Sequence, residues 1–163
     1  MRWMVSWTPS RYSKSMLYFE EVPVGQEIEI GRYKPSRDEI ISFAKKWDPQ
    51  PFHIDEEAAN ASLLGGLSAS SCHTYAISSL IYAEGNQKLR TTAMMGLEMN
   101  FPHPVRPDEE LVLMEHFLDA RLSKSRPGQG VVQSRSTLLN ERGEAVLVRT
   151  AHYLVACRPK EMG

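Results

Sequence analysis

The sequence has few of the features that mark secreted, membrane-spanning or nucleic-acid-binding proteins. Only two cysteines, Cys72 and Cys157, occur in 163 residues, which excludes the disulfide framework of a small secreted domain. No apolar run approaches the ~20 residues that cross a bilayer. The net charge at pH 7 is −1, so there is no electrostatic reason to expect nucleic acid or an anionic membrane as a partner. We therefore expect a cytoplasmic protein.

The length and composition predict one folded domain preceded by a short tail. Apolar residues make up 42% of the chain and charged residues 24%, which is ordinary for a globular domain with a proper core. Residues 1–16 carry three basic side chains and no acidic one. We expect this stretch to be a loose tail that docks on the body through Trp3 and Trp7. Residues 17–163 are expected to form the single domain.

An acid and an imidazole lie five residues apart on a segment stiffened by proline. Asp48 and His53 flank Pro49 and Pro51. Proline fixes its own φ and moves the preceding residue out of the helical region, so the loop is expected to be extended and stiff. Proton transfer needs an acid and a base that are in place before substrate arrives. The alternative from residue types alone is that Asp48 is a turn residue and His53 packs.

Three helices are predicted between residues 36 and 85. Ser36 followed by Glu39 is a capping box that opens a helix ending near residue 46. Asp55 is expected to cap a short second helix. The strongest signal covers residues 70–84, which are apolar over most of the helix circumference, and Gly85 is expected to cap its C-terminus. A helix that is apolar nearly all round is expected to be buried.

Alternation of apolar and polar residues predicts one strand before these helices and four long strands after them: residues 26–33, 92–101, 110–121, 130–140 and 144–157. One buried helix followed by long antiparallel strands predicts an α+β fold in which a sheet wraps around the helix. Such a sheet leaves uncovered edges. We therefore expect two subunits to pair, as a homodimer or a higher even oligomer.

The ordered motifs of this chain resemble those of the MaoC-like hydratases and dehydratases, which act on acyl thioesters. The family motif is Asp, any residue, Asn, Pro, any residue and His. Asp48, Pro51 and His53 match it, whereas Gln50 replaces the Asn and Trp47 replaces a Gly that usually precedes the Asp. Three later stretches also look like the family: residues 104–107, 125–130 and 140–144. The resemblance covers roughly residues 18–159 and implies the hot-dog fold.

The resemblance also implies two further site residues on the long helix. Ser71 falls where the family has a Gly whose N–H points at the thioester oxygen, and Ser79 matches a Ser that hydrogen-bonds near the catalytic pair. The first N–H groups of a helix lack partners inside it and carry the positive end of its dipole, so they would polarise a thioester carbonyl. The alternative is that Ser70 and Ser71 are caps and Ser79 is a small helix residue.

The reaction implied by the resemblance is reversible addition of water to a 2-enoyl-CoA, generally giving the (R)-3-hydroxyacyl isomer. Asp48 and His53 would share one water and move its protons, while the enolate oxygen rests against the Ser71 N–H. The substrate would be an acyl-CoA or acyl-carrier thioester, with no separate cofactor and no metal. Two alternatives remain open: a thioesterase on the same fold, and a non-catalytic acyl-thioester binding subunit, which the departures at Trp47 and Gln50 leave possible.

Other reactive side chains form weaker patterns. Cys72 and His73 are adjacent on a helix and point in different directions, so they cannot form a nucleophile and base pair; His73 is expected to pack. Three arginines could meet the phosphates of coenzyme A or stay solvated: Arg106, Arg121 and Arg126. Three scattered histidines are expected to be structural: His103, His116 and His152.

Overall fold

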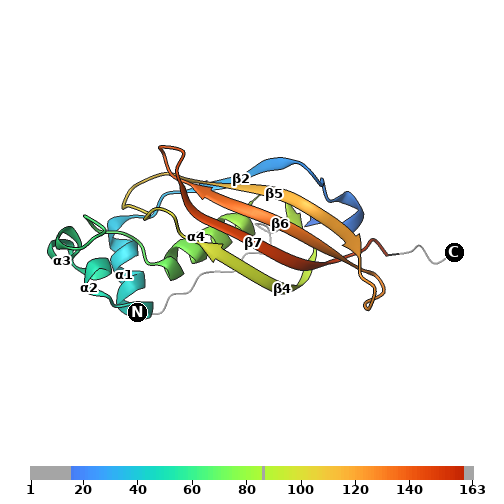
Figure 1. Ribbon diagram of the computed structural model, residues 1–163, viewed down its shortest axis with the longest axis horizontal. Helices are drawn as coiled ribbons and strands as arrows, with labels where there is room; N and C mark the ends of the chain where they lie inside the picture. Colours follow the sequence, from blue (N-terminus) through green and yellow to red (C-terminus); the bar gives the residue numbers. More distant parts are fainter. Residues whose placement is uncertain (1–15, 86, 160–163) are drawn as a thin grey trace.

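A curved antiparallel sheet wraps around one long helix in the computed structural model, which describes residues 16–85 and 87–159 (Figure 1). The helix is α4, Ser71–Glu84. The strands follow the order β2-β5-β6-β7-β4, with bounds Glu27–Tyr33, Leu111–Leu122, Gln129–Leu139, Ala145–Ala156 and Thr91–Asn100. This is the predicted hot-dog fold, with each predicted strand within two residues of its place. The predicted docking of Trp3 and Trp7 lies outside the described residues.

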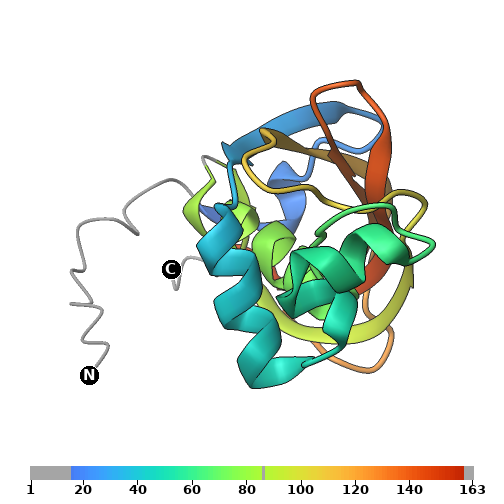
Figure 2. The ribbon, with the colours of Figure 1, turned by 90° about the vertical axis from the view of Figure 1, so that its left-hand side faces the viewer.

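Three short helices gather at the end of the molecule where α4 begins: α1, Arg37–Trp47; α2, Pro51–Ile54; and α3, Glu56–Ala61 (Figure 2). Ser36 caps α1 by accepting from the Glu39 N–H at 3.2 Å, and Asp55 caps α3 by accepting from the Ala58 N–H at 2.8 Å. Both caps were predicted. The reciprocal half of the capping box was not found, because the Glu39 carboxylate instead accepts from the Tyr33 hydroxyl at 2.9 Å.

The segment after Pro51 differs from the extended loop that the prolines predicted. Gln50 is extended, with φ −73° and ψ 139°, but Pro51 then occupies the first position of α2. Proline suits that position because its fixed φ is already helical and its missing N–H would have no helical partner. His53 therefore lies on a single helical turn rather than on an extended loop.

The core lies between α4 and the concave face of the sheet. Ile77 and Ile81 of α4 pack there against a large apolar cluster that includes Leu111, Leu113, Leu138 and Leu147. Burying each such side chain stabilises the fold by about 1.5–3 kcal/mol. The expectation that α4 is buried all round is wrong for the single chain, since Leu80 is 40% exposed. The sheet reaches only one side of the helix.

The end of α4 is shaped by packing rather than by backbone conformation. Gly85 is the C-cap, as predicted, but its φ is −63°, which any residue can adopt. A Cβ at this position would lie 2.4 Å from Ile30 Cγ2 of β2. Gly85 is therefore needed because the helix end approaches the strand closely.

Three small elements were not predicted. Strands β1, Met16–Leu17, and β3, Lys88–Leu89, pair in parallel, and the 3-10 helix η2 covers Phe19–Glu21. Each is too short to show a periodic pattern in the sequence. None of the described helices has the length and apolar character that crossing a membrane requires.

Candidate active site

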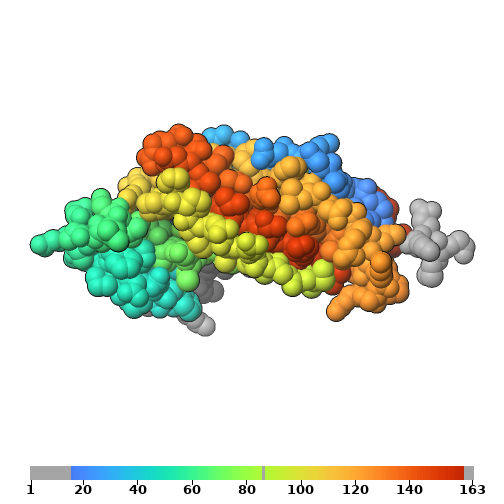
Figure 3. All heavy atoms as spheres, in the orientation of Figure 1, coloured from blue at the N-terminus to red at the C-terminus, as the bar shows by residue number. Residues whose placement is uncertain are grey.

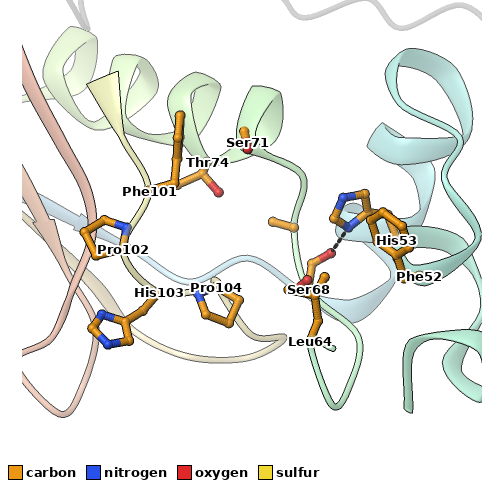
Figure 4. A pocket seen from close by; sticks show the side chains of 11 residues that line it. Phe52, His53, Leu64, Ser68, Ser71, Thr74, Phe101, Pro102, His103 and Pro104 are labelled. Carbon is orange, nitrogen blue, oxygen red and sulfur yellow. Dashed lines mark hydrogen bonds between the residues drawn. The ribbon is translucent and has the colours of Figure 1, made fainter. Parts of the chain in front are cut away.

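A cavity of about 330 Å³ opens at the N-terminus of α4 (Figure 4). Its walls come from three parts of the chain: Phe52 and His53 of α2, the stretch from Leu64 to Thr74 that leads into α4, and the four residues 101–104 after β4. The sheet and the short helices therefore meet around the start of the central helix.

His53 is held in this wall by a hydrogen bond that assigns its tautomer. The side chain is 7% exposed, and its Nδ1 lies 2.7 Å from the carbonyl oxygen of Ser68. A carbonyl oxygen can only accept, so the proton of the neutral imidazole is assigned to Nδ1 and Nε2 is left as an acceptor. The ring also meets Phe52 edge to face, with centroids 4.6 Å apart. This arrangement leaves on Nε2 a lone pair that can take up a proton.

The N-terminus of α4 presents two backbone donors that nothing in the described part of the chain accepts. Ser70 is the N-cap: its Oγ accepts from the His73 N–H at 3.2 Å and its carbonyl from the Thr74 N–H at 2.9 Å. The N–H groups of Ser71 and Cys72 remain, and Ser71 lines the cavity. With the positive end of the helix dipole, these donors suit an oxygen that gains negative charge.

The structure brings His53 and Ser71 to one cavity, whereas Asp48 and Ser79 do not line it. Asp48 is the C-cap of α1, with its N–H donating to Ala44 O at 2.9 Å and its carbonyl accepting from the Gln50 N–H at 2.8 Å. This fixes its backbone just before α2. Ser79 lies eight residues along α4 from Ser71, about 12 Å at the helix rise. The roles of all four residues stay predictions.

Arg106 is committed to the chain itself rather than available for coenzyme A phosphates. Its guanidinium donates to the carbonyls of Gly66 at 2.6 Å and Leu67 at 3.2 Å, and also to that of Leu64. These carbonyls belong to the turn that leads directly to Ser68. Arg106 therefore stabilises the segment whose Ser68 carbonyl orients the His53 ring.

His73 packs against other side chains, as predicted, and does not form a nucleophile and base pair with Cys72. Its ring stacks on Phe43 with centroids 4.3 Å apart, and its Nε2 lies 3.1 Å from Glu39 Oε1. Burial lowers the pKa of His73, and Glu39 only partly opposes this effect. The same carboxylate, together with burial, raises the pKa of Tyr33 to about 12. Cys72 is exposed.

Thr74, Phe101 and His103 are among the cavity residues that the sequence did not indicate. His103 was expected to be structural, but it stands at the cavity rim with Nδ1 3.1 Å from the carbonyl of Ala145. The available signal was the pair of prolines on either side of His103, Pro102 and Pro104. A stiff loop directly after a strand is a common position for a site.

Comparisons with known proteins identify similar chains. Residues 19–137 match the family described as "MaoC like domain". The uncharacterized protein YdeM of Bacillus subtilis (strain 168) is 34% identical over 113 residues, which cover 67% of this chain and 79% of that protein. The crystal structure of a MaoC-like dehydratase from Rhodospirillum rubrum has a TM-score of 0.82 and 40% identity, covering 88% of this chain and 99% of that one. The unliganded (R)-hydratase PhaJ1 from Pseudomonas aeruginosa has a TM-score of 0.70 and 21% identity, covering 88% of each chain.

Proposed function

The chain belongs to the MaoC-like domain family, and on that premise we propose that it is a hydro-lyase that adds water reversibly to a 2-enoyl thioester of coenzyme A. The product is a 3-hydroxyacyl thioester. The observation that carries the proposal is the shared cavity of the His53 imidazole and the Ser71 N–H. The names of the Rhodospirillum and Pseudomonas proteins, a dehydratase and an (R)-hydratase, support it.

The imidazole of His53 supplies the base. Nε2 takes a proton from water as the water oxygen bonds to C3 of the enoyl group. The Ser68 carbonyl accepts the Nδ1–H and stabilises the imidazolium that forms. A proton is then delivered to C2, so one O–H bond breaks while C3–O and C2–H bonds form. Asp48, at the other end of the same short segment, is the proposed second proton carrier.

The start of α4 stabilises the intermediate. Addition at C3 pushes charge onto the thioester oxygen, which becomes an enolate oxygen. In this proposal the N–H of Ser71, with that of Cys72 beside it, donates to this oxygen. Donors that are already oriented need no rearrangement during the reaction, which is why they lower the barrier.

We also propose that two copies pair through β4 and the outer side of α4. Figure 3 shows β4 along the outer edge of the visible face. Large apolar side chains are exposed along this region: Leu80, Met94, Met95, Met99 and Phe101. The opposite edge, β2, instead carries the charged pair Glu29 and Arg32, and charge discourages edge pairing. Phe101 belongs to both the apolar region and the cavity wall, so pairing would border the site.

The test is incubation with a panel of 2-enoyl and 3-hydroxyacyl thioesters, read by mass spectrometry. Gain or loss of one water supports the hydratase. Release of free thiol would instead assign the protein as a thioesterase. Tight binding with neither reaction would assign it as an acyl-thioester binding subunit.

A further inference from the structure

Three buried polar side chains lie side by side on neighbouring strands, on the face of the sheet that α4 covers. Glu115, Ser136 and Arg149 are paired in register on β5, β6 and β7 and are 1%, 1% and 4% exposed. Ser136 Oγ donates to the Glu115 carboxylate, and Arg149 Nε donates to Ser136 Oγ at 2.7 Å. We call these three residues, together with the tyrosines around them, the polar cluster: Glu115, Ser136, Arg149, Tyr75, Tyr82 and Tyr153.

The tyrosines of the polar cluster face Arg149. Its guanidinium carbon lies 5.9 Å from the ring centroids of both Tyr75 and Tyr82 on α4. Burial raises the pKa values of Tyr82 and Tyr153, and the positive charge of Arg149 acts in the opposite direction on both. These phenols are therefore neutral hydroxyl groups near pH 7, able to donate a hydrogen bond.

Most of the donors in the polar cluster are unused within the described part of the chain. Of the five N–H donors of a guanidinium, only the Arg149 Nε–H has a hydrogen-bond partner there, the Ser136 hydroxyl. The Tyr75 and Tyr153 hydroxyls also have no partner among the described residues. Nearby on β6, the buried Ser134 Oγ is likewise unpartnered. The two terminal nitrogens of Arg149 are not among the buried atoms that lack a partner in the described part of the chain, so they remain accessible to an acceptor.

The polar cluster is linked to the cavity wall along β4 and along α4, although its own residues do not line the cavity. Arg149 pairs with Met99 on β4, and Phe101, two residues further along the chain and just past the end of β4, lines the cavity. On α4, Tyr75 follows the cavity residue Thr74. The polar cluster thus begins one strand repeat, about 7 Å, beyond the cavity wall. Because the bulky carrier must extend toward solvent, an acyl chain with its thioester oxygen at Ser71 extends inward along α4, toward Arg149.

We propose that the polar cluster receives the far end of the acyl chain and selects 2-enoyl thioesters whose chain ends in a carboxylate. The proposal rests on the proposed function. The planar fork of Arg149 matches the two oxygens of a carboxylate, and the Tyr75 hydroxyl offers a third donor. Glu115, linked through Ser136, holds the guanidinium in place. A chain ending in methyl leaves these donors unpaired, and a site built to hydrogen-bond its substrate rejects such an analogue.

The test compares kcat/KM for two 2-enoyl thioesters of equal chain length, one ending in carboxylate and one in methyl. The wild-type protein should favour the carboxylate by a factor on the order of 10². Arg149→Lys keeps the charge but not the fork, and Tyr75→Phe removes only a hydroxyl; both should reduce this ratio, while turnover of the methyl-ended substrate persists. The matched control is Arg135→Met, an exposed arginine on the other face of β6. A wild-type ratio near one, or a ratio unchanged in both variants, would overturn the proposal.

A binding measurement separates failure of this proposal from failure of the proposed function. Saturated thioesters with carboxylate or methyl ends cannot be hydrated, so calorimetry on them reports the subsite alone. Tighter binding of the carboxylate-ended thioester, weakened by Arg149→Lys, supports the subsite even if no 2-enoyl thioester is hydrated. Equal affinities in the wild-type protein would overturn the subsite, even if hydration is observed.

Discussion

The His53 imidazole donates from Nδ1 to the carbonyl oxygen of Ser68, fifteen residues further along the chain, at 2.7 Å. This one bond connects the motif that carries the base to the segment that begins α4. It sets the tautomer of His53 and the position of its Nε2 relative to the Ser71 N–H. One segment therefore connects the proposed base, His53, with the proposed oxygen-binding N–H of Ser71.

Replacing His53 by Gln should lower hydration by a factor on the order of 10² to 10⁴, because the general base is lost. Gln is close in size and can still donate to the Ser68 carbonyl, so thioester affinity should persist. The control is His152→Gln, an exposed histidine on β7. Turnover, affinity and Tm are measured on both variants. Retained hydration in His53→Gln would remove His53 from the mechanism.

Asp48→Asn tests whether the acid acts with His53 although it does not line the cavity. If the two share one water, Asp48→Asn should nearly abolish hydration, and the double variant should be little worse than either single one. A structural role would instead lower Tm and leave kcat largely unchanged. Kinetics and melting curves of the two single variants and the double variant decide between these outcomes.

Ser71→Pro should remove the proposed oxygen donor without breaking α4. Ser71 is the first residue of the helix, where proline is well tolerated because that N–H has no helical partner. Activity should fall by a factor on the order of 10² to 10³. Ser71→Ala keeps the N–H and should be much milder. Equal losses in two folded variants would argue against a backbone role.

Arg106→Met should lower kcat by a factor on the order of 10 to 10², because a loosened 64–67 turn lets the Ser68 carbonyl and the His53 ring shift. The expected signature is a changed His53 tautomer ratio in ¹⁵N NMR spectra of the imidazole. Arg32→Met is the control, since it removes only exposed ion pairs with Glu29 and Glu110. A lower Tm with the tautomer and kcat unchanged would contradict the positioning role.

Stability should fall below about pH 6.5 because of His73. Burial lowers the pKa of His73 from its ordinary value of 6.5, so on acidification the unfolded chain takes up this proton before the folded protein does. Its contribution to stability is therefore complete above pH 6.5 and declines as the pH drops toward the lowered folded pKa. His73→Phe, which preserves an aromatic stack on Phe43, should flatten the dependence of Tm on pH between 7.5 and 5.5. His152→Gln should leave that dependence as it is in the wild-type protein.

Pairing through β4 predicts that light scattering finds a dimer or a higher even oligomer. Met95→Lys places a charge on the edge of β4 and should shift the population toward monomer, because edge charges oppose strand pairing. Val24→Lys, at a similarly exposed apolar residue near β2, is the control and should leave the oligomer intact. A wild-type monomer at working concentrations would contradict the pairing.

The sequence alone determined the elements whose cause is local. Ser36 and Asp55 accept from N–H groups three residues ahead, and such caps can be identified from residue types at fixed spacing. Alternation gave the long strands, most clearly β5, β6 and β7, in which buried residues recur on one face. The proximity of Asp48 and His53 in the chain marked a candidate site, and His53 lines the cavity whereas Asp48 does not.

Only the tertiary structure decided which distant groups meet. Glu115, Ser136 and Arg149 are joined across 21 and 13 residues by strand register, and Arg106 reaches the 64–67 turn from about 40 residues away. Neither contact produces a periodic pattern in the sequence, because each depends on how separate strands and loops align in space. A local pattern follows from the geometry of one helix or strand, whereas the partners of a buried charge follow from the packing of the whole chain.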